Sequence, residues 1–193
     1  MSKKPSTFFN MVTTLFGVAL ISSAGVGLVY EVTKAPIAQA QLAKKVSAVR
    51  EVVPEFNNDP IAEAYELSSD IGPLTAYPAR KDGVLVGVAI ETITQKGFGG
   101  EVKLMVGLKT DGAIQAVQVL EHKETPGLGD KMDPAKSDFM AQFRNKNPAK
   151  FRLMVKKDGG DVDAITAATI SSRAVCDAVQ RAYNAFEAKL QNS

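Results

Sequence analysis

The sequence has one cysteine, one histidine and no tryptophan, and these scarcities exclude several classes of site. The single cysteine, Cys176, cannot form an intramolecular disulfide or supply a cysteine-ligated zinc or iron–sulfur site within this chain. The single histidine, His122, likewise excludes a metal site with several histidine ligands. Because the usual catalytic side chains are scarce, we expect the chemistry of this chain to belong to a bound cofactor.

Neither sign of charge is in large excess, since 23 basic and 21 acidic residues leave a net charge of +2. That balance argues against bulk electrostatic binding of nucleic acid. Hydrophobic residues make up 45% of the 193 positions, which is enough for an ordinary core. The length predicts one globular domain with an additional segment.

The additional segment is an apolar run near the N-terminus. Lys3 and Lys4 are followed by no charged residue until Glu31, and residues 8–30 are apolar or small. At about 1.5 Å per residue in a helix, this run spans the roughly 30 Å hydrocarbon core of a bilayer. The lysines predict that residues 1–7 lie in the cytoplasm, so that the rest of the chain after the span lies outside.

A cleaved signal peptide is the alternative interpretation of this segment. Ala38-Gln39-Ala40 resembles a cleavage site. However, Glu31 and Lys34 lie between the apolar run and that site, and the run is longer than a usual signal core. A retained anchor is therefore favoured, and both interpretations place the domain outside the cytoplasm.

A juxtamembrane helix is expected over residues 31–54. Pro36 suits its start and Pro54 its end. One helical face carries apolar side chains, at Leu42, Val46, Val49 and Val53. Residues 55–72 are polar and predict irregular structure.

The rest of the chain predicts a single α+β domain over residues 55–193, with an antiparallel sheet and flanking helices. Asp82-Gly83 and Asp111-Gly112 are hairpin turn sequences between runs of alternating apolar residues. Ser137 is placed to cap a short helix. A last helix is expected from about Ser172 to Leu190. Its predicted buried stripe is Val175, Val179, Ala182, Phe186 and Leu190.

Two glycine-rich segments stand out from this scaffold. Gly97-Phe98-Gly99-Gly100 enters a predicted strand, where glycine permits close backbone approach or a positive φ. The run from Glu124 to Gly129 reads Glu-Thr-Pro-Gly-Leu-Gly and presents Leu128 between glycines. An apolar side chain so placed suits the face of a flat ring, although a plain connecting loop would have the same composition.

A third segment, residues 161–172, carries four hydroxyl side chains just before the last predicted helix. Ser171 or Ser172 could simply cap that helix. Alternatively, the free N–H groups and the dipole of a helix N-terminus favour a phosphate there, and a threonine hydroxyl could carry it as an ester.

With these segments in order, the sequence resembles a known family. It is similar to the FMN-binding domain shared by the G subunit of the Rnf electron transport complex and the C subunit of the sodium-pumping quinone reductase Nqr. That family has a motif Asp-x-x-Ser/Thr-Gly/Ala-Ala-Thr, matched here by Asp163, Thr166, Ala167, Ala168 and Thr169. The Glu-Thr-Pro-Gly-Leu-Gly loop and the glycine-rich strand entry also match. The compact length favours the Rnf protein over the longer Nqr protein.

The resemblance implies that FMN is joined covalently to Thr169 through a phosphoester, attached by a separate flavin transferase. The other expected cofactor-binding residues are Asp163, Thr166, Ala168, Glu124, Thr125, Gly127, Leu128 and Gly99.

The resemblance also implies a place in the cell. The chain would relay electrons among other membrane subunits of an Rnf-type ferredoxin:NAD oxidoreductase that transports ions, without turnover of its own. It would cross the inner membrane once, with the flavin domain on the periplasmic side. A separate anchored flavoprotein is one alternative. A binding module without flavin is a second, against which the intact acceptor motif argues. A hydrolase using Thr169 is a third, and it lacks support because the only histidine is remote in sequence and the threonine is not N-terminal.

Overall fold

The structure is a computed structural model that describes residues 7–191. Lys3 and Lys4, on which the predicted orientation in the membrane depends, lie outside the described residues. The chain divides into two units, residues 1–43 and residues 44–193. Each unit is described by itself.

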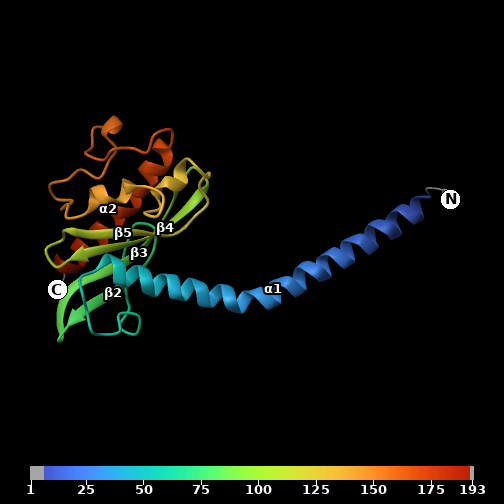
Figure 1. Cartoon of the computed structure of the whole chain (residues 1–193), viewed down its shortest axis with the longest axis horizontal. Coiled ribbons are helices and arrows are strands. Elements are labelled where there is room, and N and C mark those ends of the chain that lie inside the picture. Colours follow the sequence, from blue (N-terminus) through green and yellow to red (C-terminus); the bar gives the residue numbers. More distant parts are fainter. Residues whose placement is uncertain (1–6, 192–193) are drawn as a thin grey trace. The chain divides into compact units, whose positions relative to one another are not determined.

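The first unit holds most of a single long helix, α1 (Phe8–Val52) (Figure 1). The prediction that a separate helix begins at Pro36 is wrong, because α1 runs through that residue. Proline removes one intrahelical hydrogen bond, and the many remaining bonds of a 45-residue helix preserve it on both sides. The most apolar 18 residues of α1 include no buried side chain, and the helix is long and apolar enough to cross a membrane. This fits a single-pass anchor, while its border at residue 30 stays a prediction.

The second unit is built on a five-stranded antiparallel sheet in the order β1-β2-β3-β4-β5. The strands are β1 (Tyr65–Leu67), β2 (Leu74–Lys81), β3 (Val84–Gly97), β4 (Gly100–Lys109) and β5 (Ile114–His122). Both predicted hairpin turns are present. Asp82 and Gly83 have φ of 53° and 81°, as a two-residue turn of this kind requires, and Gly112 has φ of 78°.

The prediction that residues 55–72 are irregular is wrong at β1, and β2 is implied only by the hairpin turn that follows it. β1 has only three residues, and Pro78 interrupts the pattern of β2. Proline is tolerated at position 78 because β1 pairs with β2 only as far as Ala76. On the β1 side of β2, no strand therefore needs an N–H donor from Pro78.

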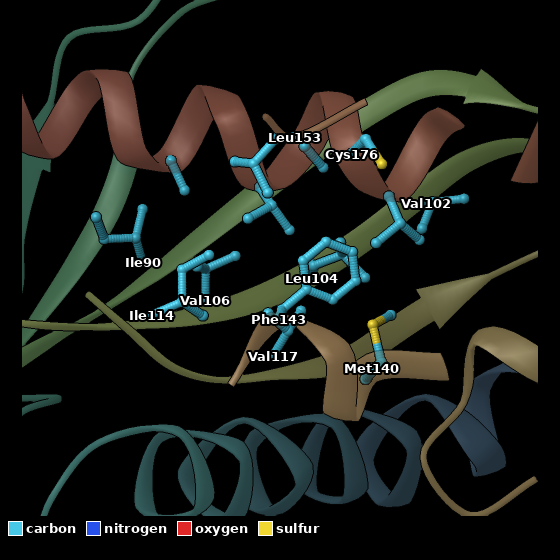
Figure 2. Close-up of a cluster of buried hydrophobic side chains, with 14 of the residues drawn as sticks. Ile90, Val102, Leu104, Val106, Ile114, Val117, Met140, Phe143, Leu153 and Cys176 are labelled. Atoms are coloured by element: carbon cyan, nitrogen blue, oxygen red, sulfur yellow. The ribbon is translucent and has the colours of Figure 1, made fainter. Parts of the chain in front are cut away.

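Helix α2 (Thr169–Gln191) lies across one face of the sheet and closes the main hydrophobic core (Figure 1). Figure 2 shows side chains of β3, β4 and β5 meeting Cys176 of α2 and Phe143 of the 3-10 helix η2 (Asp138–Phe143). Ser137 caps η2 as predicted, by accepting the N–H of Phe139 at 3.2 Å. Four residues of the predicted α2 stripe are buried, whereas Leu190 is 48% exposed because the last turn extends beyond the core.

The last turns of α1, residues 44–52, cover the opposite face of the sheet. Val49 and Val52 are buried there beside Met105. Of the predicted helical face, Val49 and Val53 are buried and Val46 is half-buried, whereas Leu42 is 54% exposed. Gly107 of β4 permits this packing, since a Cβ at that position would collide with the Val52 carbonyl. Two short 3-10 helices, η1 (Gly129–Met132) and η3 (Lys156–Asp158), lie in the connections that precede α2.

Candidate functional site

Thr169 is the first residue of α2 and follows a tight turn. Ala167 in that turn has φ of 62°, a left-handed conformation that glycine adopts more easily than alanine. The Ser172 hydroxyl fixes the turn from inside the helix. It donates to the Ala168 carbonyl at 3.0 Å and accepts the N–H of Ile165 at 2.9 Å. Ser172 therefore acts from the fourth position of α2, and the expectation that it or Ser171 is the N-cap residue is wrong.

The four hydroxyl groups of this segment are not equally available. Ser171 and Ser172 are buried, and both hydroxyls are hydrogen-bonded within the protein. Thr166 is exposed and Thr169 is half-buried, and neither hydroxyl bonds to any residue that the structure describes. Only the two threonines are therefore free to carry a covalent group.

Glu124 is a buried carboxylate that joins the glycine-rich segments to α2. It is only 6% exposed. Its Oε1 accepts the N–H of Gly99 at 3.1 Å, and its Oε2 accepts the Ser171 hydroxyl at 2.6 Å. A Cβ at Gly97 or Gly129 would collide with this carboxylate. Two of the glycines that stand out in the sequence are therefore required by the space that Glu124 occupies.

A small hollow of about 150 Å³ opens beside this carboxylate. Three large apolar side chains around it face solvent: Phe98 is 69% exposed, Leu128 43% and Ile170 46%. Its lining is completed by Glu124, Thr125, Gly129, Ala167, Ala168 and Ser171. Exposed apolar side chains that gather from three separate segments are typical of a surface that an apolar ligand or partner covers.

Asp163 and Thr166 line a second hollow of about 390 Å³, on the side of Lys131. Gln142 holds the Asp163 backbone by accepting its N–H at 2.8 Å and donating to its carbonyl at 3.1 Å. The Asp163 carboxylate pairs with Lys156 at 2.8 Å. Asp163 and Thr166 thus line a different hollow from Ala167 and Ala168 of the same motif.

The predicted site residues fall into groups. Glu124, Thr125, Leu128 and Ala168 meet in the smaller hollow, and Gly99 joins them through its bond to Glu124. Gly127, with φ of 80°, shapes the turn that presents Leu128 and lines neither hollow. The remaining predicted residues are Thr169, which is at the helix start and lines neither hollow, and Asp163 and Thr166, which line the larger one.

Phe98 and Ile170 were missed by reasoning from the sequence. The signal for Phe98 was present, because it stands between glycines as Leu128 does. Ile170 carried no signal of its own, since only the helix start at Thr169 turns it toward the hollow.

The other candidate reactive groups are structural. The His122 ring accepts the N–H of Glu124 through Nδ1 at 3.1 Å. Burial raises the pKa of the Cys176 thiol to about 12, so it carries no thiolate at neutral pH. Among the residues described, no three metal-ligating side chains cluster.

Comparisons with known proteins identify the family. Residues 97–184 match the family model described as the FMN-binding domain. The G subunit of the ion-translocating oxidoreductase complex of Vibrio cholerae is 38% identical, over 85% of this chain and 83% of its own length. The corresponding protein of Shewanella amazonensis is 39% identical, over 86% and 82%.

The chain belongs to the family of G subunits of ion-translocating oxidoreductase complexes. A third member, from Stutzerimonas stutzeri, is 36% identical and covers 93% of this chain. The crystal structure of Shewanella oneidensis NqrC matches with a TM-score of 0.51 at 22% identity, over 76% of this chain and 73% of NqrC. That similarity shows a shared fold. The family and the α+β fold expected from the sequence are both confirmed.

Proposed function

We propose that this protein carries FMN joined by a phosphoester to Thr169 and relays electrons within an Rnf-type ion-translocating oxidoreductase. One observation carries the proposal. The free hydroxyl of Thr169 lies at the N-terminus of α2, directly before two residues that line the hollow ringed by Phe98, Leu128 and Ile170.

The start of α2 suits the phosphate end of FMN. The first N–H groups of a helix have no acceptor within the helix, and the helix dipole places partial positive charge at this end. Both favour a phosphate esterified to Thr169. Thr166 also has a free hydroxyl, but it lines the larger hollow, whose lining includes none of the exposed apolar side chains Phe98, Leu128 and Ile170.

The smaller hollow suits the apolar part of a flat ring. Leu128 and Phe98 are held by glycine-flanked backbone, and both would cover ring faces and exclude water there. A hollow of about 150 Å³ is well below the roughly 300 Å³ at which binding pockets usually begin, so it cannot enclose a cofactor. A ring bound there keeps an accessible edge, which a relay between partner proteins requires.

FMN, when bound, can take up and release one or two electrons. The protein contributes position and environment. Glu124 holds the two glycine-rich segments against α2 through Gly99 and Ser171, so the side chains around the hollow keep fixed places.

A separate flavin transferase attaches the group in this proposal. The Thr169 oxygen forms a bond to the FMN phosphorus of FAD, the pyrophosphate bond breaks, AMP leaves, and the hydroxyl proton passes to a base of the transferase. Asp163 and Thr166, which are exposed and line the larger hollow, are then available to the transferase.

Helix α1 is the proposed single inner-membrane span, with the flavin domain on the periplasmic side. The apolar exposed surface of α1 supports the span, and Lys3 and Lys4 in the sequence support the orientation. The other membrane subunits of the complex are the expected partners. The 35–39% identity to the G subunits of such complexes favours the Rnf type over the Nqr type.

Co-expression with an active flavin transferase tests the attachment. The parent chain, Thr169→Ala and Thr166→Ala are denatured, separated on a gel and inspected for flavin fluorescence. Fluorescence in the parent and in Thr166→Ala, with none in Thr169→Ala, is expected. A dark parent band beside a labelled control substrate would refute the proposal, and loss only in Thr166→Ala would move the acceptor to that residue.

A further inference from the structure

Arg173 lies one helical turn after Thr169, and no role in FMN binding follows for it from the motif itself. Residues four apart in a helix share a face, with about 5–6 Å between their Cβ atoms. Long side chains in a helix also lean toward its N-terminus. Arg173 therefore begins on the same face of α2 as Thr169, within the reach of a long side chain from its hydroxyl.

The guanidinium of Arg173 is held in a fixed orientation by Asp158. Nε donates to Oδ2 at 2.7 Å and Nη2 donates to Oδ1 at 2.8 Å. The backbone of Asp158, the last residue of η3, is held in place by the following Gly159, which has φ of 85°, and by the Val155–Val162 bridge that closes the loop. The Arg173 guanidinium holds the pKa of the Asp158 carboxyl below its ordinary value, so the pair stays charged at neutral pH.

This arrangement leaves donors for a second anion. Arginine has five N–H groups, of which Asp158 engages two along the Nε–Nη2 edge. Within the part of the chain that the structure describes, Arg173 has no other acceptor. The Nη1–Nη2 edge stays available, and its paired N–H groups match two oxygens of a phosphate. The Arg173 side chain is 45% exposed, so its guanidinium is accessible to a group attached outside the core. The cavity of about 660 Å³ that Arg173 also borders does not include Thr169.

The other cations near the motif are less suitable. Lys156 is paired with Asp163 at 2.8 Å, and it is a single point charge on a flexible chain. Lys131 is less suitable because it lines the larger hollow with Asp163 and Thr166, and Thr169 is not part of that lining.

We infer that Arg173, oriented by Asp158, is the positioning residue for the phosphate that links FMN to Thr169. The inference rests on the proposed attachment at Thr169. Asp158 fixes one edge of the guanidinium, and the other edge bonds the two free oxygens of the phosphodiester. The phosphate end is thereby fixed while the ring lies toward Leu128.

Phosphorus NMR of the flavin-loaded full chain in detergent tests this contact. The quantity measured is the offset of the phosphodiester resonance between the native and the denatured protein. Four variants are compared with the parent: Arg173→Gln, Arg173→Lys, Asp158→Asn and Lys156→Gln. Arg173→Gln should lose most of the offset and Arg173→Lys part of it. Lys156→Gln should match the parent.

Asp158→Asn separates positioning from a purely structural role. It breaks the same ion pair as Arg173→Gln but leaves the guanidinium charge in place, so it should keep more of the offset. Equal offsets in these two variants would mean that only the ion pair matters, and would overturn the inference. If Arg173→Gln folds but stays unloaded, Arg173→Lys takes its place, and an unchanged offset there would count against Arg173.

The two levels of proposal fail differently. If the parent carries flavin and Arg173→Gln shows the same offset as the parent, only the role of Arg173 is overturned. A parent without flavin in its denatured gel band overturns the attachment at Thr169 and this inference together.

Discussion

Replacing Ser171 by alanine should destabilise the domain through a single buried contact. The Ser171 hydroxyl donates to Glu124 Oε2 at 2.6 Å, and Glu124 is only 6% exposed. Removing the donor leaves a buried carboxylate oxygen without a partner, which costs about 1–3 kcal/mol. With a central value of about 2 kcal/mol, Tm should fall by about 4–8 °C for a domain of this size.

The isosteric variant Glu124→Gln is the matched comparison. Its amide oxygen can still accept the Gly99 N–H, and its amide nitrogen can donate to the Ser171 oxygen. Because both contacts survive, we expect a loss below about 1 kcal/mol. In the double variant the two changes should be non-additive, since the residues share one bond.

Urea denaturation of the full chain in detergent, followed by circular dichroism, measures these free energies. The slope of the unfolding free energy against urea should stay unchanged, so that midpoints can be compared directly. An unaltered midpoint in Ser171→Ala, or equal losses in Ser171→Ala and Glu124→Gln, would refute the role assigned to this contact.

Three further predictions follow from other contacts. Ala167→Gly should leave the free energy of unfolding almost unchanged, because glycine adopts the φ of 62° more easily but gains conformational freedom in the unfolded chain. Ala167→Val should lower the free energy of unfolding, measured by urea denaturation, by about 1–2 kcal/mol. Arg173 depresses the pKa of Asp158 below its usual 3.8, so the ion pair stabilises the fold above that pH and loses this effect as the carboxylate is protonated. The urea midpoint should therefore fall more steeply below pH 4 in the parent than in Asp158→Asn. Parallel curves of midpoint against pH for the two proteins would contradict this. Cys176 is 3% exposed, and burial raises the pKa of its thiol to about 12, so it should react with a thiol reagent at pH 8 far more slowly in the native protein than in urea; equally fast labelling of both would contradict this.

Local sequence signals predicted much of the domain correctly. Asp82-Gly83 and Asp111-Gly112 specify their turns with adjacent residues, and the buried stripe of α2 follows from helical periodicity up to Phe186. The motif that ends at Thr169 also lies within one short segment. Such features depend on neighbours in sequence, so they can be read without the fold.

The contacts that build the site could not be predicted in this way. Glu124 bonds to Gly99, 25 residues before it, and to Ser171, 47 residues after it. The backbone of Asp163 is held by Gln142, which is 21 residues away in sequence. These pairings follow from the order of the strands and the path of the loops.

The central claim is tested most directly by mass spectrometry of the loaded protein. Trypsin should release residues 158–173 as one peptide, which contains Thr166, Thr169, Ser171 and Ser172. The account predicts that this peptide gains the mass of one FMN less one water, and that its fragment ions place the added group on Thr169. An unmodified peptide from a preparation in which the transferase labels a control substrate, or fragments that place the group on another residue, would contradict it.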